Sequence, residues 1–250
     1  MKIALVFIIS VLTCTAYSQK LETEQTNMGV LIGAGNTNLL DEYISPSDYT
    51  GVPISFGVFW SEIGKAKETG INFEYSVIKN LEYLNSRADT YDFLLDYRIL
   101  YNIFEGKFFD KPLRVYLGPD FGIYMHYRDQ KVANNSKALS IASALTAGAE
   151  ASAVSKITKK VTAAGHLSLA LLSFTARTPS LKDAGNIPTP VALLTLPTII
   201  DLRFSISARY YITQRIMLRI GYGNKFLLID KWDKFRMITD NLFFGLGMDF

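Results

Sequence analysis

The feature that most constrains this chain is a strict alternation of apolar and polar side chains over residues 91–103. The apolar series consists of Tyr91, Phe93, Leu95, Tyr97, Ile99, Tyr101 and Ile103. Successive side chains of a β-strand point to opposite faces, so this segment would have one apolar face and one mostly polar face. A helix would place Asp96 and Arg98 on different sides and break up the aromatic row. The alternation therefore predicts an amphipathic β-strand.

The same alternation returns along the chain, separated by turn-rich sequence. It is clear over residues 113–126, 200–210 and 238–250, and weaker segments begin near Met28, Pro53, Gly70, Leu139, Val161 and Arg215. The Ala-rich residues 142–153 would also suit a helix by composition. Ten such segments result, each near the ~9–11 residues that a tilted strand needs to cross a bilayer. An even number of strands returns both ends of a barrel to the periplasmic side.

The breaks between these segments predict connections of roughly alternating length. The longer ones, expected at the outer end, cover residues 36–50, 80–88, 129–137, 176–197 and 229–235, and the shorter, inner ones cover 62–68, 105–110, 155–159 and 213–214. Residues 178–197 contain Pro179, Pro188, Pro190 and Pro197, which cannot donate to a strand ladder, so no continuous strand is expected there. Their apolar run 191–196 would either fold over the barrel mouth toward a partner or pack against the rim.

The start of the chain does not follow this rhythm. Lys2, the apolar residues 3–13 and the small-residue site Ala16-Tyr17-Ser18 have the order of a secretory signal. We therefore expect residues 1–18 to be a signal peptide and residues 19–27 a short periplasmic leader.

Lipoprotein processing at Cys14 is the alternative for this segment. Val11 and Thr13 stand where a lipobox requires Leu and a small residue, which disfavours that alternative. Cleavage after Ser18 would leave a mature chain without cysteine. Disulfide chemistry and thiol-ligated metal chemistry are then excluded.

Alternation alone does not decide which face of the sheet points inward. The polar face uses mainly small residues with Asp and Arg, whereas lysine concentrates in the turns, as at Lys65, Lys67, Lys156, Lys159 and Lys160. A water-exposed sheet normally carries Lys and Glu, whereas a crowded lumen suits small residues and paired charges. Aromatic residues of the apolar face also gather near strand ends, as in the girdles of membrane barrels. The expected girdle residues are Trp60, Tyr101, Tyr210 and Phe250 at one rim, and Tyr91, Tyr127 and Tyr222 at the other. The alternative is that these aromatics form the core of a soluble β-protein.

Residues 241–250 resemble the closing strand of outer-membrane β-barrel proteins, and residues 117–122 are similar to glycine-punctuated strands of that superfamily. In such proteins, alternating apolar residues and a terminal aromatic serve as the assembly signal. By this resemblance the signal consists of Leu242, Phe244, Leu246, Met248 and Phe250. The resemblance implies insertion by the barrel-assembly machinery into the outer membrane of a Gram-negative bacterium, among outer-membrane lipids and lipopolysaccharide.

These observations predict an all-β protein whose residues 28–250 form a single antiparallel, transmembrane, up-and-down β-barrel of ten strands, within a range of eight to twelve. Charged residues on the polar face should point into the lumen, because a basic residue in mid-bilayer costs ~2–4 kcal/mol. The predicted lumen network consists of Glu74, Asp92, Asp96, Arg98, Arg114, Asp120, Glu150, Asp201, Arg203, Arg209 and Arg219. A hairpin turning near Gly106 would place Arg98 roughly opposite Tyr116, with Arg114 and Asp120 as diagonal neighbours.

Two patterns raise the question of catalysis. His166 and Ser168 share a strand face, and outer-membrane lipid A deacylases use a His-x-Ser pair with a Glu, for which Glu150 is a candidate. The Asn that usually follows is Leu169 here, and the serine would point into the lumen. Omptin-type proteases are ten-stranded and use acidic residues with a rim His, a role for which His126 with Asp92 or Asp129 could be considered.

The sequence therefore favours a barrel with a filled or narrow polar lumen and a structural, envelope-associated or partner-binding role without catalysis. A narrow channel for small polar solutes is the alternative, followed by a lipid A-modifying acyl hydrolase or an accessory barrel of a secretion system. No cofactor or metal ion is expected, the protein partner is not identified, and the scattered net charge of +3 does not indicate nucleic-acid binding.

A closed barrel has no free strand edge, which predicts unusual resistance to unfolding in detergent. The protein should therefore fractionate with outer membranes and should migrate faster in detergent gels before boiling than after it. Recovery in the soluble periplasmic fraction would contradict the membrane assignment.

Overall fold

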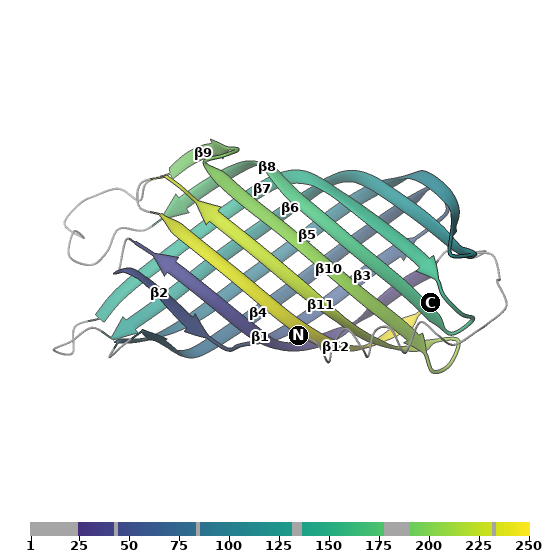
Figure 1. Cartoon of the computed structure of the whole chain (residues 1–250), viewed down its shortest axis with the longest axis horizontal. Coiled ribbons are helices and arrows are strands. Elements are labelled where there is room, and N and C mark those ends of the chain that lie inside the picture. Colours follow the sequence, from purple (N-terminus) through teal and green to yellow (C-terminus); the bar gives the residue numbers. More distant parts are fainter. Residues whose placement is uncertain (1–24, 43–44, 84–85, 132–136, 178–190, 232–233) are drawn as a thin grey trace.

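The computed structural model describes residues 25–42, 45–83, 86–131, 137–177, 191–231 and 234–250, and these form a barrel of long, strongly tilted antiparallel strands (Figure 1). The predicted signal peptide and most of the predicted leader therefore lie outside the described residues. The strands are β1 Gln25–Asp41, β2 Ser45–Gly51, β3 Pro53–Ile63, β4 Lys67–Tyr83, β5 Ser86–Phe108, β6 Lys111–Lys131, β7 Lys137–Lys156, β8 Val161–Arg177, β9 Val191–Thr195, β10 Ile199–Tyr211, β11 Ile216–Ile229 and β12 Phe235–Asp249.

These twelve elements occupy ten positions around the barrel. β2 and β3 follow one another along the same side of β1, and β9 and β10 do so along β8. The sheet closes because β12 pairs with β1 from Asn27 opposite Asp249 to Asp41 opposite Phe235. We call the end where β1 begins and β12 ends the inner end, and the opposite end the outer end. The all-β, antiparallel, ten-stranded closed barrel predicted from the sequence is confirmed.

The two faces of the sheet differ as the alternation predicts. Val30, Phe56 and Leu246 project outward with about half of their surface exposed, although each is strongly apolar. Arg98, Asp120 and Glu150 project inward and are buried. Such an exterior is favourable in hydrocarbon and unfavourable in water, so the fold is that of a membrane barrel. The described residues contain no helix long and apolar enough to cross a membrane.

Several strands run well beyond the length predicted from the sequence. β5 has 23 residues and β6 has 21, about twice what a bilayer requires. The predicted connections 36–50, 80–88, 62–68 and 105–110 are therefore wrong in large part, because β1, β2, β4 and β5 continue into them. The Ala-rich residues 142–153 lie within β7 and are not helical.

The turn between β5 and β6 is shorter than the predicted connection 105–110. Only Phe109 and Asp110 separate the two strands, and both have positive φ angles, of 48° and 59°. This left-handed conformation closes a tight turn. The turn lies further along the chain than the predicted reversal near Gly106, so Arg98 lies opposite Asp120 and not Tyr116.

The interior of the outer end contains an apolar cluster, which the sequence analysis did not predict. Leu39, Tyr49, Leu227 and Phe235 are almost completely buried there and belong to one cluster that spans most strands of the barrel. On the β11–β12–β1 side, a row of polar residues lies on the exterior next to this level. Asp240 lies opposite Asn36 on one side and Asn224 on the other, and it accepts a 2.7 Å hydrogen bond from the Asn224 side chain. The exterior of this part of the barrel is therefore mixed, because the apolar Phe226 and Ile238 lie opposite one another beside this polar row.

A smaller apolar cluster closes the inner end. It contains Ile63, Leu100, Tyr116, Val154 and Ala164, each at most 2% exposed. The Tyr116 hydroxyl donates a 2.9 Å hydrogen bond to the backbone carbonyl of Gly64, which lies between β3 and β4. The polar part of the lumen lies between these two apolar layers.

The proline-containing connection 178–197 is partly a strand. Residues 178–190 lie outside the described part of the chain, but the apolar run that follows them forms β9 and pairs with β8 from Ala176 opposite Val191 to Leu172 opposite Thr195. Within the described residues, no continuous strand crosses this connection, because β9 ends at Thr195 and β10 begins only at Ile199. The apolar run lies along β8, in the sheet itself. Pro197 lies in the break between β9 and β10, where its lack of an N–H group costs no ladder hydrogen bond.

Substitutions in β10 can test whether neighbouring side chains point to opposite faces of the sheet. Phe204 is 43% exposed on the apolar exterior, whereas Ser205 lines the interior cavity. Phe204→Arg should lower the free energy of unfolding by ~2–4 kcal/mol near mid-bilayer depth or prevent insertion. Ser205→Arg should be tolerated better. Urea unfolding in lipid vesicles measures both, and the reverse ranking would show that the faces are assigned incorrectly.

Candidate functional site

The candidate site is the polar section of the lumen. All eleven charged residues of the predicted lumen network point into the barrel: Glu74, Asp92, Asp96, Arg98, Glu150, Arg203 and Arg219 line a central cavity, Asp120, Asp201 and Arg209 are buried elsewhere in the lumen, and Arg114 is buried near the inner end, where it pairs with Glu105. The cavity has a volume of about 210 Å³. Tyr124 and Met237 of the outer apolar cluster form part of its wall. The cavity therefore lies between the charged residues of the lumen and the outer apolar cluster.

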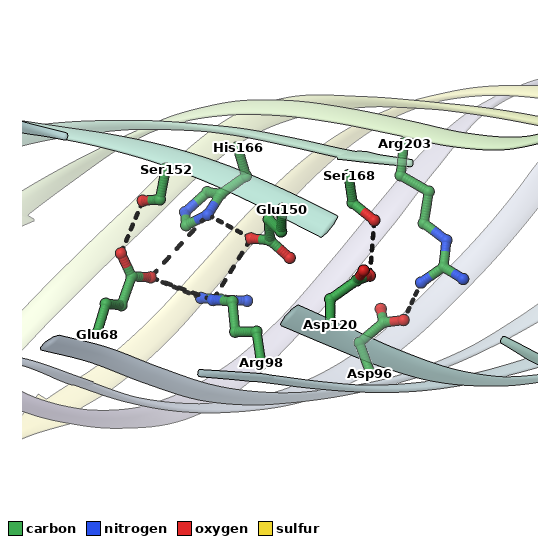
Figure 2. Close-up of polar contacts among 9 residues, drawn as sticks. All are labelled: Glu68, Asp96, Arg98, Asp120, Glu150, Ser152, His166, Ser168 and Arg203. Carbon is green, nitrogen blue, oxygen red and sulfur yellow. Dashed lines mark hydrogen bonds and ion pairs between the residues drawn. The ribbon is translucent and has the colours of Figure 1, made fainter. Parts of the chain in front are cut away.

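A group of charged residues occupies the inner part of this section, where Figure 2 shows side chains converging from β4, β5, β7 and β8. The Arg98 guanidinium lies 3.1 Å from Glu68 Oε1 and 3.5 Å from Glu150 Oε1. His166 Nδ1 lies 2.9 Å from Glu150 Oε1, and Ser152 donates a 2.7 Å hydrogen bond to the second oxygen of Glu68. These five residues, which we call the inner ion cluster, share two carboxylates between an arginine and a histidine.

The inner ion cluster corrects the expected pairing of Arg98. Asp120 lies opposite Arg98 in the strand register, but the guanidinium contacts Glu68 and Glu150. Glu68 was missed because it follows Lys65 and Lys67 and was assigned to a turn; the structure places it in β4, fully buried. Glu68 precedes Glu74 by an even number of residues, and alternate residues of a strand share a face. This spacing was the sequence signal that could have placed Glu68 in the lumen with Glu74.

A glycine makes room for this arrangement. Gly70 lies opposite Arg98 on β4, and a Cβ atom at this position would be 2.7 Å from Arg98 Cζ. A side chain there would displace the guanidinium, so the position of Arg98 depends on the absence of a side chain at its neighbour.

A second group of charges lies further toward the outer end. Arg203 contacts Asp96, and Ser168 donates a 2.6 Å hydrogen bond to Asp120 (Figure 2). Arg203 also contacts Asp201. Lys225, from β11, lies 3.6 Å from the centroid of the Tyr124 ring. Opposite charges thus come into contact across strands that are distant in sequence.

Three further buried groups, absent from the predicted network, lie at the outer end. Asp41 is bound by Arg177 and by Ser140, whose hydroxyl donates at 2.9 Å. Arg128 stacks on the Tyr49 ring with its Cζ 4.2 Å from the centroid. These residues were overlooked because the sequence analysis placed Asp41 in a loop and ended the neighbouring strands earlier.

The geometry does not support the two catalytic arrangements considered from the sequence. Ser168 donates to Asp120 while His166 bonds Glu150, so each side chain is engaged by a different carboxylate, and both face the buried lumen. His126 does bond Asp92, at 2.8 Å, but it is fully buried, with the Phe235 ring 5.2 Å away, and does not reach the rim. A nucleophile or base that acts on lipid or protein must be accessible to it. Within the described residues, no group of three or more His, Cys, Asp or Glu side chains could hold a metal ion.

The expected girdle residues lie on the exterior. Tyr101, Tyr210 and Phe250 are exposed, and Trp60 is half-buried near the inner end. Tyr91 and Tyr127 face one another with ring centroids 5.8 Å apart. Tyr222 donates its hydroxyl to Asp240. The expected assembly residues Leu242, Phe244, Leu246, Met248 and Phe250 all project outward from β12 or its end.

Comparison with known proteins shows which solved structures share this fold. No family model matches the chain, and no curated protein matches its sequence. The solved structure of the outer membrane protease OmpT from Escherichia coli aligns with 96% of this chain and all of its own, at 9% identity and a TM-score of 0.50. The chain has the outer-membrane β-barrel fold. This β-barrel is also similar to the translocator domain of the autotransporter NalP from Neisseria meningitidis, with 99% of this chain and 94% of that chain covered, 10% identity and a TM-score of 0.49. Neisserial surface protein A covers 89% of this chain with 97% of its own length, at 13% identity and a TM-score of 0.41. At these identities the likeness concerns the fold alone.

Breaking the inner ion cluster should destabilise the β-barrel. Arg98→Met leaves Glu68 and Glu150 without their guanidinium, and removing one partner of a buried ion pair costs ~3–5 kcal/mol. Urea unfolding in lipid vesicles should show this loss, and adding Glu68→Gln should restore part of it. The matched control is Arg236→Met, since Arg236 pairs with Asp48 on the exterior and such exposed pairs contribute at most about 1 kcal/mol. Equal losses of unfolding free energy in Arg98→Met and Arg236→Met would show that the inner ion cluster does not stabilise the barrel.

Proposed function

We propose that the protein resides in the outer membrane as a closed, non-conducting barrel with an envelope-associated role that does not involve catalysis. The single observation that supports this most strongly is the layered filling of the lumen. The outer apolar cluster, the charged section and the inner apolar cluster follow one another along the barrel axis. A hydrated ion moving through would have to cross both apolar layers.

The outer end of the barrel indicates on which side of the membrane this role would be performed. In the orientation usual for such barrels, both chain ends face the periplasm, so the outer end faces the cell exterior. The strands there continue past the apolar band and carry polar side chains outward on the β11–β12–β1 side. We infer that this extension contacts lipopolysaccharide or a protein partner at the cell surface. Insertion would rely on the barrel-assembly machinery and on the outward-facing residues of β12.

A narrow channel for small polar solutes remains the second candidate, supported by the charged central cavity. Conduction would need the apolar layers to open, and the buried hydroxyl of Tyr116 bonded to Gly64 opposes opening at the inner end.

Planar-bilayer recording separates the two candidates. The purified barrel should give no stable single-channel steps under conditions where a general porin conducts, because the apolar layers exclude hydrated ions. Removing one side chain from each layer, with Tyr116→Ala and Phe235→Ala combined, should produce measurable steps if filling is what closes the lumen. Stable steps from the native protein would favour the channel.

A further inference from the structure

Two arginines face one another inside the barrel beside the inner ion cluster. Arg209 on β10 and Arg219 on β11 are directly opposite in the strand register, and both side chains project into the lumen. Arg209 is fully buried and Arg219 is 7% exposed. Like charges at directly opposite positions of an antiparallel pair repel one another, and burial weakens the screening that water would provide.

The carboxylates nearby are already engaged. Glu68 and Glu150 are contacted by Arg98 and by His166 or Ser152. Asp249, half-buried at the inner end, acts on Arg209 only at longer range. Among the described residues, no carboxylate oxygen lies within 4.0 Å of either the Arg209 or the Arg219 guanidinium.

Several donors of the pair also lack a partner. In the described part of the chain, Nε and Nη1 of Arg209 and Nε of Arg219 are buried and find no hydrogen-bond acceptor. A buried charged donor without a partner is strongly unfavourable. The faces of Arg219 are occupied, because its Cζ lies 4.9 Å from the Phe59 ring centroid and 5.3 Å from that of Phe243. Its free donors are therefore on the edge of the guanidinium, where anions bind.

We propose that Arg209 and Arg219 form a binding site for a small oxyanion inside the lumen. A planar guanidinium donates two parallel N–H groups to a carboxylate, sulfate or phosphate. Two arginines therefore match the several oxygens of such an anion better than they match a spherical anion such as chloride. The anion would bind in the central cavity, which Arg219 lines and whose volume of about 210 Å³ is sufficient for one such group. It would enter the closed lumen during transient opening of one of the apolar layers. The site is enclosed by the barrel wall, so the ligand is a free small anion and not the phosphate of a membrane lipid.

Binding to the native state alone raises stability by mass action, which makes the site measurable. The probe is inorganic phosphate, added to the purified full-length mature barrel in detergent at constant ionic strength. The thermal midpoint of the native protein should rise with phosphate concentration. Arg219→Gln should abolish that rise, and in phosphate-free buffer its midpoint should equal or exceed the native one, because the substitution removes the repulsion.

A matched control is Arg236→Gln, which makes the same chemical change on the exterior and should keep the full response to phosphate. Arg209→Gln provides a second variant if Arg219→Gln fails to fold. Equilibrium dialysis with radiolabelled phosphate should give one bound anion per native barrel and none for Arg219→Gln or Arg209→Gln. An equal phosphate response in the native protein and in these variants, or a response lost only in Arg236→Gln, would overturn the proposal. Conduction by the native barrel would bear on the proposed function and not on this test.

Discussion

The structure depends on one constraint: ionisable side chains of the membrane-spanning strands must avoid hydrocarbon. Alternation sends them inward, where the barrel is too narrow to solvate each one separately. They therefore meet as contacts between distant segments, such as Glu68 with Arg98 and Asp96 with Arg203. Asp96 with Arg203 joins β5 and β10, and Arg98 with Glu150 joins β5 and β7. Neither pair of strands is adjacent in the sheet, so these contacts brace the barrel across its lumen. The same constraint makes the unpaired arginines at positions 209 and 219 conspicuous.

Much of this architecture could be predicted from the sequence because its signal is local. Alternation assigns Phe204 and Ser205 to opposite faces without knowledge of any neighbour. Contacts depend on register, however, and register depends on the exact position of each turn. The reversal at Phe109 and Asp110 lies beyond the one predicted near Gly106, and this shift places Asp120 instead of Tyr116 opposite Arg98 on β6. Sequence reasoning therefore found many of the lumen residues, missed Glu68 and Asp41, and misassigned the partners of Arg98.

The apolar interior of the outer end escaped prediction for a different reason. Leu39 and Leu227 occupy positions of the mostly polar face, so each reads as an isolated exception along its own strand. Only the assembled barrel shows that such exceptions from many strands lie at one level. The histidines illustrate the same limit: His126 and His166 suggested catalysis, but the fold buries both and joins the Nδ1 of each to a carboxylate.

The outer core also changes what holds the molecule together when lipid is absent. A barrel whose strands are stabilised mainly by a surrounding bilayer loses that support on extraction. Here the same strands continue into a section packed around Leu39, Leu227 and Phe235, whose burial does not involve the bilayer. The packing of these side chains is an interaction among the strands themselves, so it persists in detergent as well as in lipid. The outer ends of the strands are therefore held together by side-chain packing as well as by the backbone ladder.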